Sequence, residues 1–484
     1  MMLKIKLKDV LVILVFGSAF LIYYWSTFLQ YHNVHENSDI KEILDKEIIS
    51  LKERYEIPAL GIAIVNDGEI VYQNAFGMLD VNQRIEYTIN SPIRVQSISK
   101  SVTSIAIAKL VDEYNLDVNQ PLGEFINLSN LNIEKSALKS VTIEELLTHT
   151  SGLTLGDIFA MYDPYAPIPT LKKSLERTID FNSSMANKFY YSNTGYNLLE
   201  WIIEQVTHQS FEQYVKNEVL DPLNMTNSTF DFHALKNKPK LAGYSITHKP
   251  IAMYVYAEKG SGELFSTLND MTKFINYMST INDSDWLDLN LTFKTKMLQV
   301  NAEDIGIYNF VYDGYGYGFY IETLKENDFA IAHGGQGAGV MSHFHVLPND
   351  QSGVVILTNS QRSWPMIAHV LSLYRRMYGF NMIKMESLIY IEATSFAIVG
   401  CLVGGLILSL KRLNEMIRHK RIVSSKRYFI CSLVVVGVIT WSLSQDYLLL
   451  TSVLPMSGFA ILISLLLLAL SYLIRPIIGR FIQR

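Results

Sequence analysis

The segment Val95-Gln96-Ser97-Ile98-Ser99-Lys100-Ser101-Val102-Thr103 sets the expectations for the rest of the chain. It opens residues 97–114, where small and apolar residues recur at helical spacing, so we expect a buried or half-buried helix. Ser97 and Lys100 form a Ser-x-x-Lys pattern, and residues three apart on a helix share a face. The amine of Lys100 can therefore reach the hydroxyl of Ser97. A serine becomes a good nucleophile only beside a base, and a lysine acts as that base only when its pKa is lowered.

Extended runs lie on both sides of this helix and of the helical middle of the chain. The two early runs are separated by Asn66-Asp67-Gly68, a hairpin signal, and Pro348-Asn349-Asp350 separates the last two runs. The pattern predicts an α/β (α+β) fold, with one antiparallel sheet built from both ends of the domain, flanked by helices, plus an inserted helical subdomain. The predicted strands are Ala59–Val65, Glu69–Phe76, Phe329–His333, Val340–Leu347 and Gly353–Thr358.

Four apolar stretches are long enough to cross a bilayer as helices, which takes about 20 residues each. They give three predicted parts: an N-terminal membrane anchor (residues 1–30), an extracytoplasmic domain (31–386), and three transmembrane helices with a basic cytoplasmic loop (387–484). The N-terminal stretch lacks a small-x-small cleavage site after Phe20, so we expect an anchor that is retained rather than a cleaved signal peptide. The four predicted spans are Val10–Phe28, Leu388–Leu410, Tyr428–Leu450 and Val453–Ile474.

The distribution of charge agrees with this layout. The net charge is only -5, but residues 31–386 carry 28 basic and 42 acidic residues, whereas the apolar ends are basic. Basic residues flank the cytoplasmic ends of membrane spans, which places both termini inside and the central domain outside. An acidic central domain does not suit a nucleic-acid-binding protein. Both cysteines, Cys401 and Cys431, lie in the apolar C-terminal part, so the central domain has no disulfide and no cysteine-based metal site.

Two further patterns are candidates for chemistry. Tyr191-Ser192-Asn193 precedes a predicted helix, where an exposed phenol can point into a cleft, although a core tyrosine with a satisfied hydroxyl is the simpler interpretation. His333-Gly334-Gly335 ends a predicted strand, and adjacent glycines allow the backbone to approach a ligand closely. Taken alone, His333 is more often an ordinary strand histidine than a functional one.

Together these segments resemble the serine β-lactamase/DD-peptidase superfamily, in its class C β-lactamase-like branch of penicillin-binding proteins, esterases and D-aminopeptidases. The resemblance covers about residues 45–380, with the segments in the family's order. The matching segments are Val95–Thr103, Leu146-Leu147-Thr148-His149-Thr150-Ser151-Gly152-Leu153, Tyr191-Ser192-Asn193-Thr194-Gly195-Tyr196, Asp221-Pro222-Leu223-Asn224-Met225, Gly262-Glu263-Leu264-Phe265-Ser266-Thr267 with Asp270, Tyr315-Gly316-Tyr317-Gly318-Phe319, and His333-Gly334-Gly335.

The resemblance implies a role for each residue. Ser97 would attack a carbonyl carbon and form an acyl-enzyme. Lys100 would take its proton, sharing that work with Tyr191, which would also protonate the leaving group. Asn193 would orient Lys100 and the substrate, and the backbone N–H groups of Ser97 and Gln336 would form the oxyanion hole. No metal or organic cofactor is implied, and the partners are a small peptide or ester substrate and the lipid bilayer.

The chain departs from the family at two positions. Most members have Lys-Thr-Gly where this chain has His333-Gly334-Gly335, a form that resembles the esterase and D-aminopeptidase members. His333 and Gly335 would still contact the substrate, but a neutral histidine attracts a carboxylate less than a lysine does, so efficient β-lactam hydrolysis is not expected. Arg94 stands where the colibactin-type peptidase is expected to have an acidic residue, which argues against the same D-asparagine specificity.

Three functions remain open. The leading one is a membrane-anchored serine hydrolase acting on an amide or ester, such as a D-amino-acid-containing peptide or a cell-wall polymer. The second is a prodrug-activating peptidase of a peptide-antibiotic pathway, suggested by three spans after an exported domain. The third is a non-catalytic cell-wall sensor or scaffold, against which the retained Ser97, Lys100, Tyr191 and Asn193 argue.

Overall fold

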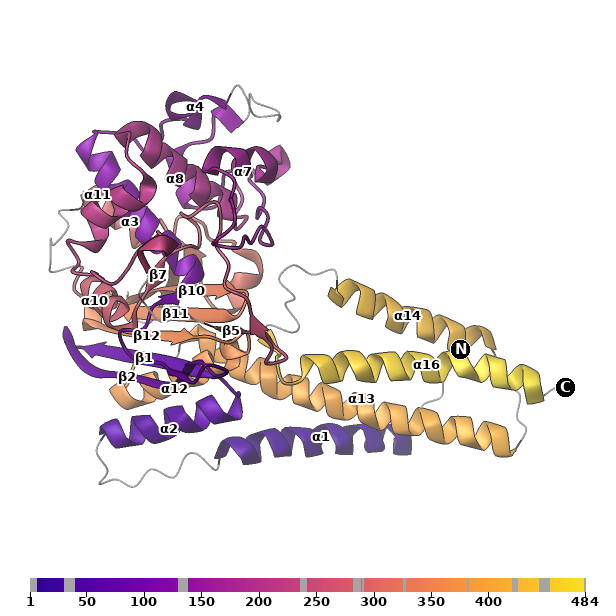
Figure 1. Ribbon diagram of the computed structural model, residues 1–484. Helices are drawn as coiled ribbons and strands as arrows, with labels where there is room; N and C mark the ends of the chain where they lie inside the picture. The colour runs from indigo at the N-terminus through magenta and orange to yellow at the C-terminus, as the bar shows by residue number, and fades with distance from the viewer. Residues whose placement is uncertain are drawn as a thin grey trace. The chain divides into compact units, whose positions relative to one another are not determined.

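The computed structural model describes residues 7–29, 40–128, 138–235, 242–281, 289, 291–324, 328–380, 383–419, 425–443 and 453–482. The chain forms two compact units, each described here by itself (Figure 1). The sheet unit comprises the described residues of Glu56–Ser363 and Val370–Glu386. The helical unit comprises those of Met1–Tyr55, Trp364–His369 and Ser387–Arg484.

An antiparallel sheet of eight strands organises the sheet unit, in the order β3-β2-β1-β12-β11-β10-β9-β8. The N-terminal strand β1 pairs with the C-terminal strand β12, with Ile62 opposite Ile356, so both ends of the domain build one sheet, as the sequence predicts. The strands are β1 (Ala59–Asn66), β2 (Glu69–Asp80), β3 (Ile85–Glu86), β8 (Gly314–Tyr315), β9 (Tyr320–Thr323), β10 (Phe329–Gly337), β11 (Val340–Leu347) and β12 (Ser352–Thr358); β4 (Ile93–Arg94) pairs β7 (Phe265–Ser266), and β5 (Gly243–Tyr244) pairs β6 (Pro250–Ile251).

The β1–β2 turn has the geometry that its sequence predicts. Asp67 and Gly68 both have positive φ, 52° and 73°, as a two-residue type I′ hairpin requires. The second predicted turn also forms, as a single 3₁₀ turn over Pro348–Asp350.

Helices cover both faces of the sheet (Figure 1). On one face, Phe274 of α10 packs against Phe344 of β11. On the other face, the Tyr374 hydroxyl of α12 hydrogen-bonds to the Ser352 hydroxyl at 2.7 Å. The helices are α3 (Ser99–Glu113), α4 (Leu122–Phe125), α6 (Ile143–Leu147), α7 (Leu171–Thr178), α8 (Asn193–Thr207), α9 (Phe211–Val215), α10 (Leu268–Ser279), α11 (Leu291–Met297) and α12 (Ser363–Tyr378), with short turns η1 (Gln96–Ile98) and η6 (Gly306–Phe310).

The helical unit contains long apolar helices that pack through small and polar residues. α13 and α16 run parallel, because Ser395 of α13 contacts Ser457, the residue before α16, and fourteen residues later in both segments Ser409 contacts Ser471, at 2.5 and 2.7 Å. Hydroxyl pairs and small residues are the usual contacts between helices in a bilayer. The helices of this unit are α1 (Leu7–Leu29), α2 (Ile40–Arg54), α13 (Ser387–Arg418), α14 (Ser425–Leu443) and α16 (Gly458–Ile482).

α2 belongs to the helical unit. A buried contact joins it to that unit: the Glu392 carboxylate on α13 accepts hydrogen bonds from the hydroxyls of Tyr55, which follows α2, and Tyr24 of α1, at 2.7 and 3.0 Å. The domain boundaries at residues 30 and 386 stay a prediction. Residues 31–39 lie outside the described part of the chain.

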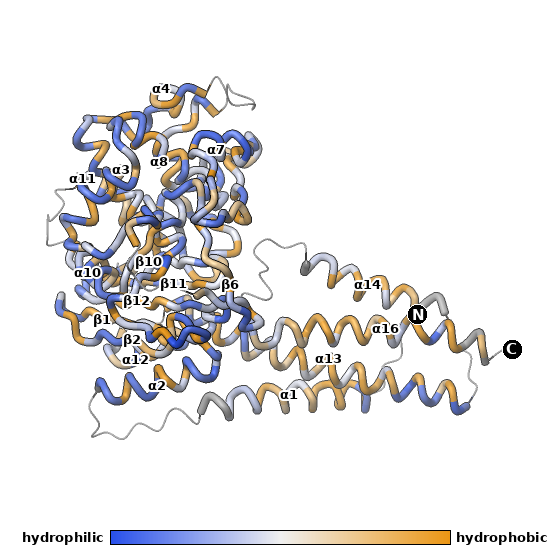
Figure 2. Tube along the Cα trace, viewed as in Figure 1, coloured by the Kyte–Doolittle hydropathy of each residue, from blue (hydrophilic) through white to orange (hydrophobic). Residues whose placement is uncertain are grey.

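Three helices, not the four expected, are long and apolar enough to cross a membrane among the described residues: Leu7–Ser26, Lys384–Arg418 and Gly458–Ile478. Figure 2 shows hydrophobic residues along most of α1, α13 and α16. The remaining predicted span, Tyr428–Leu450, gives a shorter apolar helix, Tyr428–Trp441, and its end lies within residues 444–452, outside the described residues. Several of the flanking basic residues, among them Lys4, Lys6, Lys420, Arg421 and Arg484, also lie outside them.

Candidate active site

The nucleophile candidate, Ser97, sits in η1, the 3₁₀ turn that leads into α3. Gln96 adopts a φ of +52°, which is uncommon for a residue with a side chain and recurs at functional sites. The turn is held from outside, because the Val95 N–H donates to the Leu264 carbonyl at 2.9 Å. It is also held from within, because the Ser99 hydroxyl donates to the Gln96 carbonyl at 2.6 Å. The half-buried Ser97 is therefore presented from a rigid, sharply turned backbone.

The amine of Lys100 is fully buried and meets three oxygen atoms. It lies 3.2 Å from the hydroxyl of Ser97, 2.7 Å from the side-chain carbonyl of Asn193, and 2.8 Å from the backbone carbonyl of Ser261. Two of these partners are carbonyl oxygens, which can only accept. They take two N–H bonds of the amine, so the remaining position of a neutral amine is a lone pair that faces Ser97.

Burial lowers the pKa of Lys100 well below its usual value. All three of its hydrogen-bond partners are uncharged, so no carboxylate among them offsets the cost of burying an ammonium group. The geometry and the direction of the pKa shift therefore agree. This environment favours the neutral form of Lys100, and in that form the amine can accept the proton of Ser97.

Tyr191 and Asn193 are positioned by the start of α8. The Ser192 hydroxyl accepts the N–H of Gly195 at 3.0 Å and caps the helix. The Tyr191 hydroxyl hydrogen-bonds to Ser97, but burial, and after it the neighbouring Tyr308, raise the Tyr191 pKa well above its usual value. A phenol that keeps its proton is a proton donor, whereas the neutral amine of Lys100 is the better base.

The β10 strand presses its backbone against the nucleophile turn. A Cβ atom on Gly335 would lie within 3.0 Å of the Val95 carbonyl oxygen, and one on Gly337 would lie as close to the Gln96 side chain. Only glycine permits this approach. Gln336, between the two glycines, is therefore carried to the edge of the site, where its N–H is predicted to join that of Ser97 in an oxyanion hole.

The ring of His333 is buried and held by two hydrogen bonds. It is 0% exposed; its Nδ1–H donates to the Gly334 carbonyl (2.9 Å), so Nε2 accepts from the Tyr315 hydroxyl (3.1 Å). Burial lowers the pKa of His333 to about 3. Both ring nitrogens are thus occupied, and the predicted substrate contact of His333 would need its ring to turn. Its role stays a prediction.

Three contributors to the site were given no role by the sequence. His149 packs its ring 4.5 Å from that of Tyr191 and accepts the Ser192 N–H at Nδ1. Tyr308 packs against the same Tyr191 ring at 5.8 Å. Ser261 contributes its backbone carbonyl. His149 lies inside Leu146–Leu153, one of the segments that resemble the family, so the sequence did mark it as a candidate. The acceptor at Ser261 is backbone, which no side-chain pattern reveals.

The part of the sequence that carries these residues is matched by a family model. The model for Beta-lactamase covers residues 44–369, well over half of the chain. The chain belongs to this family. Its curated relatives include Protein flp of Staphylococcus aureus strain N315, 23% identical over 377 residues that cover 73% of each chain. Another is the teichoic acid D-alanine hydrolase of S. aureus strain MRSA252, 23% identical over 335 residues, 67% of this chain and 77% of the relative.

A solved structure extends the match to three dimensions. The octameric penicillin-binding protein homologue from Pyrococcus abyssi is 25% identical, with a TM-score of 0.60, and the match covers 71% of this chain and 78% of that one. The expected family is thereby confirmed, as are the antiparallel sheet and flanking helices of this β-lactamase-family chain. The roles of its individual site residues stay predictions.

Proposed function

We propose that this protein is a membrane-anchored serine hydrolase that works outside the cytoplasm through an acyl-enzyme. The observation that carries the proposal is the environment of Lys100. Its buried amine lies within hydrogen-bond distance of Asn193, Ser261 and Ser97. In the neutral form, its two hydrogens go to the two carbonyl oxygens and its lone pair faces Ser97. A non-catalytic scaffold gains nothing from burying a lysine beside a serine, since the burial costs free energy.

In the acylation step, the Ser97 oxygen attacks the carbonyl carbon of the substrate while its proton passes to Lys100. Negative charge then develops on the carbonyl oxygen, where the N–H groups of Ser97 and Gln336 would stabilise it. When the bond to the leaving group breaks, Tyr191 supplies a proton to the departing oxygen or nitrogen, and the proton on Lys100 replaces the one that Tyr191 gave up. The bond from Ser97 to the acyl group remains.

Deacylation reverses the roles. Water attacks the acyl carbon, its proton passes through Tyr191 to Lys100 or directly to the amine, and Ser97 regains a proton as its bond to the acyl group breaks. The same pair of groups serves both half-reactions, since the neutral amine is restored after each leaving group departs.

The electrostatics of the site favour a substrate without a carboxylate beside the scissile bond. Burial favours the neutral forms of Lys100 and His333, and the guanidinium of Arg94 is paired with Glu263 at 3.3 Å. A D-alanyl ester of a wall polymer carries no such carboxylate, whereas a peptide ending in D-alanine does. Together with the relative that is a teichoic acid D-alanine hydrolase, this supports a D-aminoacyl ester of a cell-wall polymer as the substrate.

The substrate is tested by following D-alanine released from D-alanylated lipoteichoic acid by the full chain in detergent micelles. The Ser97→Ala variant is the control, and a peptide ending in D-Ala-D-Ala is the competing substrate. We expect release from the polymer that depends on Ser97 and exceeds release from the peptide. Release from the peptide alone would reverse the substrate assignment. No release from either, with Ser97 still reactive toward a general probe, would remove the wall-polymer class and favour the prodrug-activating alternative.

A further inference from the structure

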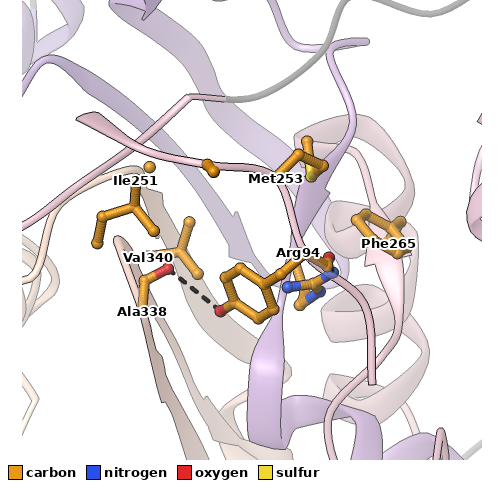
Figure 3. A pocket seen from close by; sticks show the side chains of 9 residues that line it. Arg94, Ile251, Met253, Phe265, Ala338 and Val340 are labelled. Atoms are coloured by element: carbon orange, nitrogen blue, oxygen red, sulfur yellow. Dashed lines mark hydrogen bonds between the residues drawn. The ribbon is translucent and has the colours of Figure 1, made fainter. Parts of the chain in front are cut away.

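Arg94, three residues before the nucleophile, is held inside a cluster of aromatic and acidic groups. Its side chain is only 3% exposed and pairs with the equally buried Glu263, Nε to Oε2 at 3.3 Å. Its guanidinium also donates to the Tyr254 carbonyl and lies over the rings of Tyr254 and Phe265, at 4.2 and 4.6 Å from their centroids. Figure 3 shows Arg94 and Phe265 on one side of a small pocket and Ala338 on the other.

This cluster fixes the segment 254–263 along one side of the nucleophile turn. Arg94 donates to the Tyr254 carbonyl at the start of the segment, and Glu263, its last residue, accepts the N–H of Tyr256 at 3.3 Å. The ion pair therefore ties the two ends of the segment together. The same segment supplies the Ser261 carbonyl that accepts from Lys100. A buried ion pair contributes little net stability compared with an apolar replacement, but it holds its partners in one geometry. Here Arg94 lies three residues before Ser97, and Glu263 lies two residues after Ser261, whose carbonyl accepts from Lys100.

The Tyr254 hydroxyl links the two parts of the chain that would bind the substrate carbonyl oxygen. It accepts a hydrogen bond from the side-chain amide of Gln96 at 3.0 Å and donates to the carbonyl of Ala338 at 3.2 Å, the bond drawn in Figure 3. Gln96 directly precedes Ser97. Ala338 lies in the tight connection between β10 and β11, two residues after Gln336.

We propose that Tyr254 is a positioning residue, braced by the Arg94–Glu263 pair, that sets the distance between the backbone of Ser97 and that of Gln336. The inference rests on the proposed function, because that distance matters only if the two N–H groups form the oxyanion hole. Tyr254 does not touch the reacting atoms. It acts through Gln96 on one side and Ala338 on the other.

The positions of the two glycines make this bridge consequential. Gly335 and Gly337 allow β10 to approach the turn, and the Ser342 hydroxyl of β11 joins the hairpin to the turn by donating to the Val95 carbonyl at 2.7 Å. The Tyr254 hydroxyl adds a second link, from Gln96 to the end of β10. Catalytic donors act only within a few tenths of an ångström of the correct place, and a misplacement of 1 Å can cost about 100-fold in rate. Because the Tyr254 link ends beside Gln96 on one side and two residues after Gln336 on the other, it holds the ends of the turn and of β10 that carry the two N–H groups.

The test compares Tyr254→Phe with the unaltered protein, both as full chains in detergent micelles, using a fluorophosphonate probe. The rate of labelling at saturating probe and the probe concentration at half-saturation are measured across pH. We expect the saturating rate to fall by about tenfold or more, with half-saturation and the shape of the pH profile unchanged, because Lys100 keeps its partners. Tyr87→Phe is the matched control, since it also removes the hydroxyl of a buried tyrosine, elsewhere in the sheet unit.

A second variant covers the case in which Tyr254→Phe does not fold. Gln96→Met removes the amide donor at similar size and should lower the saturating rate in the same way. In the double variant the two losses should not multiply, because both break one bridge. A wild-type saturating rate in Tyr254→Phe, an equal fall in Tyr87→Phe, or fully multiplicative losses would overturn the inference. If the unaltered protein is not labelled at all, the proposed function itself fails, which is a distinct result.

Discussion

Replacing Asn193 with aspartate should move the pH dependence of the reaction, because it places a charge beside the proposed base without changing the shape of the site. The Asn193 side-chain oxygen lies 2.7 Å from the amine of Lys100. A carboxylate there attracts an ammonium group, so it favours the protonated form of Lys100 and raises its pKa. A protonated Lys100 has no lone pair for the proton of Ser97.

The size of the shift follows from the distance. Two unit charges 2.7 Å apart attract by about 1.5 kcal/mol at the dielectric constant of water and by about 6 kcal/mol at an effective value of 20. One pKa unit corresponds to about 1.4 kcal/mol, so the pKa of Lys100 should rise by at least about one unit. In the unaltered protein the labelling rate should rise with pH through a pKa well below that of a free lysine. In Asn193→Asp this rise should occur at least one pH unit higher.

The assay is the rate of fluorophosphonate labelling of Ser97 from pH 5 to 10, with the full chain in micelles. Asn217→Asp, which adds the same charge at an exposed position, should leave the profile where it is. A profile for Asn193→Asp that stays in place, or that moves to lower pH, would refute the assignment of neutral Lys100 as the base.

Other consequences can be checked separately. Gly335→Ala places a Cβ closer than 3.0 Å to a backbone carbonyl oxygen. It should abolish labelling and, by urea unfolding, cost about 1–3 kcal/mol of folding free energy. Gly262→Ala, whose Cβ meets nothing nearer than 3.8 Å, should change neither the labelling nor the folding free energy. Burial raises the pKa of Glu322 to about 8, so its contribution to stability is present at low pH and is lost as pH rises through about 8. From pH 5 to pH 8, the melting temperature of Glu322→Gln should therefore rise relative to that of the unaltered protein. A difference between the two melting temperatures that does not change with pH would contradict this. A cysteine at exposed Lys172, in a background without the native cysteines, should react with an impermeant maleimide in intact cells, whereas one at Arg418 should react only after permeabilisation; the reverse pattern would invert the proposed topology.

Local geometry explains which features of the fold and site could be predicted from sequence. The spacing of Ser97 and Lys100 fixes their contact, because three residues make almost one helical turn. Asn66-Asp67-Gly68 predicts the first hairpin, because Asp67 and Gly68 tolerate the positive φ that its turn needs. In both cases the partners are close in sequence, so backbone geometry alone brings them together.

Contacts between distant segments could not be predicted in the same way. The Ser261 carbonyl and the Tyr254 hydroxyl reach the site from a segment about 160 residues away, and neither belongs to a spaced pattern. From the sequence, Arg94 only argues against the specificity of the colibactin-type peptidase. The structure adds that Arg94 pairs with the buried Glu263. The hydrogen bond that orients the His333 ring comes from Tyr315 on another strand of the sheet, and no pattern around His333 reveals it; the predicted substrate contact of His333 stays a prediction.

The most direct test of the account is intact-mass and peptide-mapping spectrometry of the full chain after reaction with a fluorophosphonate, beside the Ser97→Ala variant. The account predicts one added phosphonyl group, mapped to Ser97 and absent from the variant. A folded protein that gains no mass, or one that is labelled equally in the variant, would contradict an activated Ser97. The sensor or scaffold function would then fit the chain better.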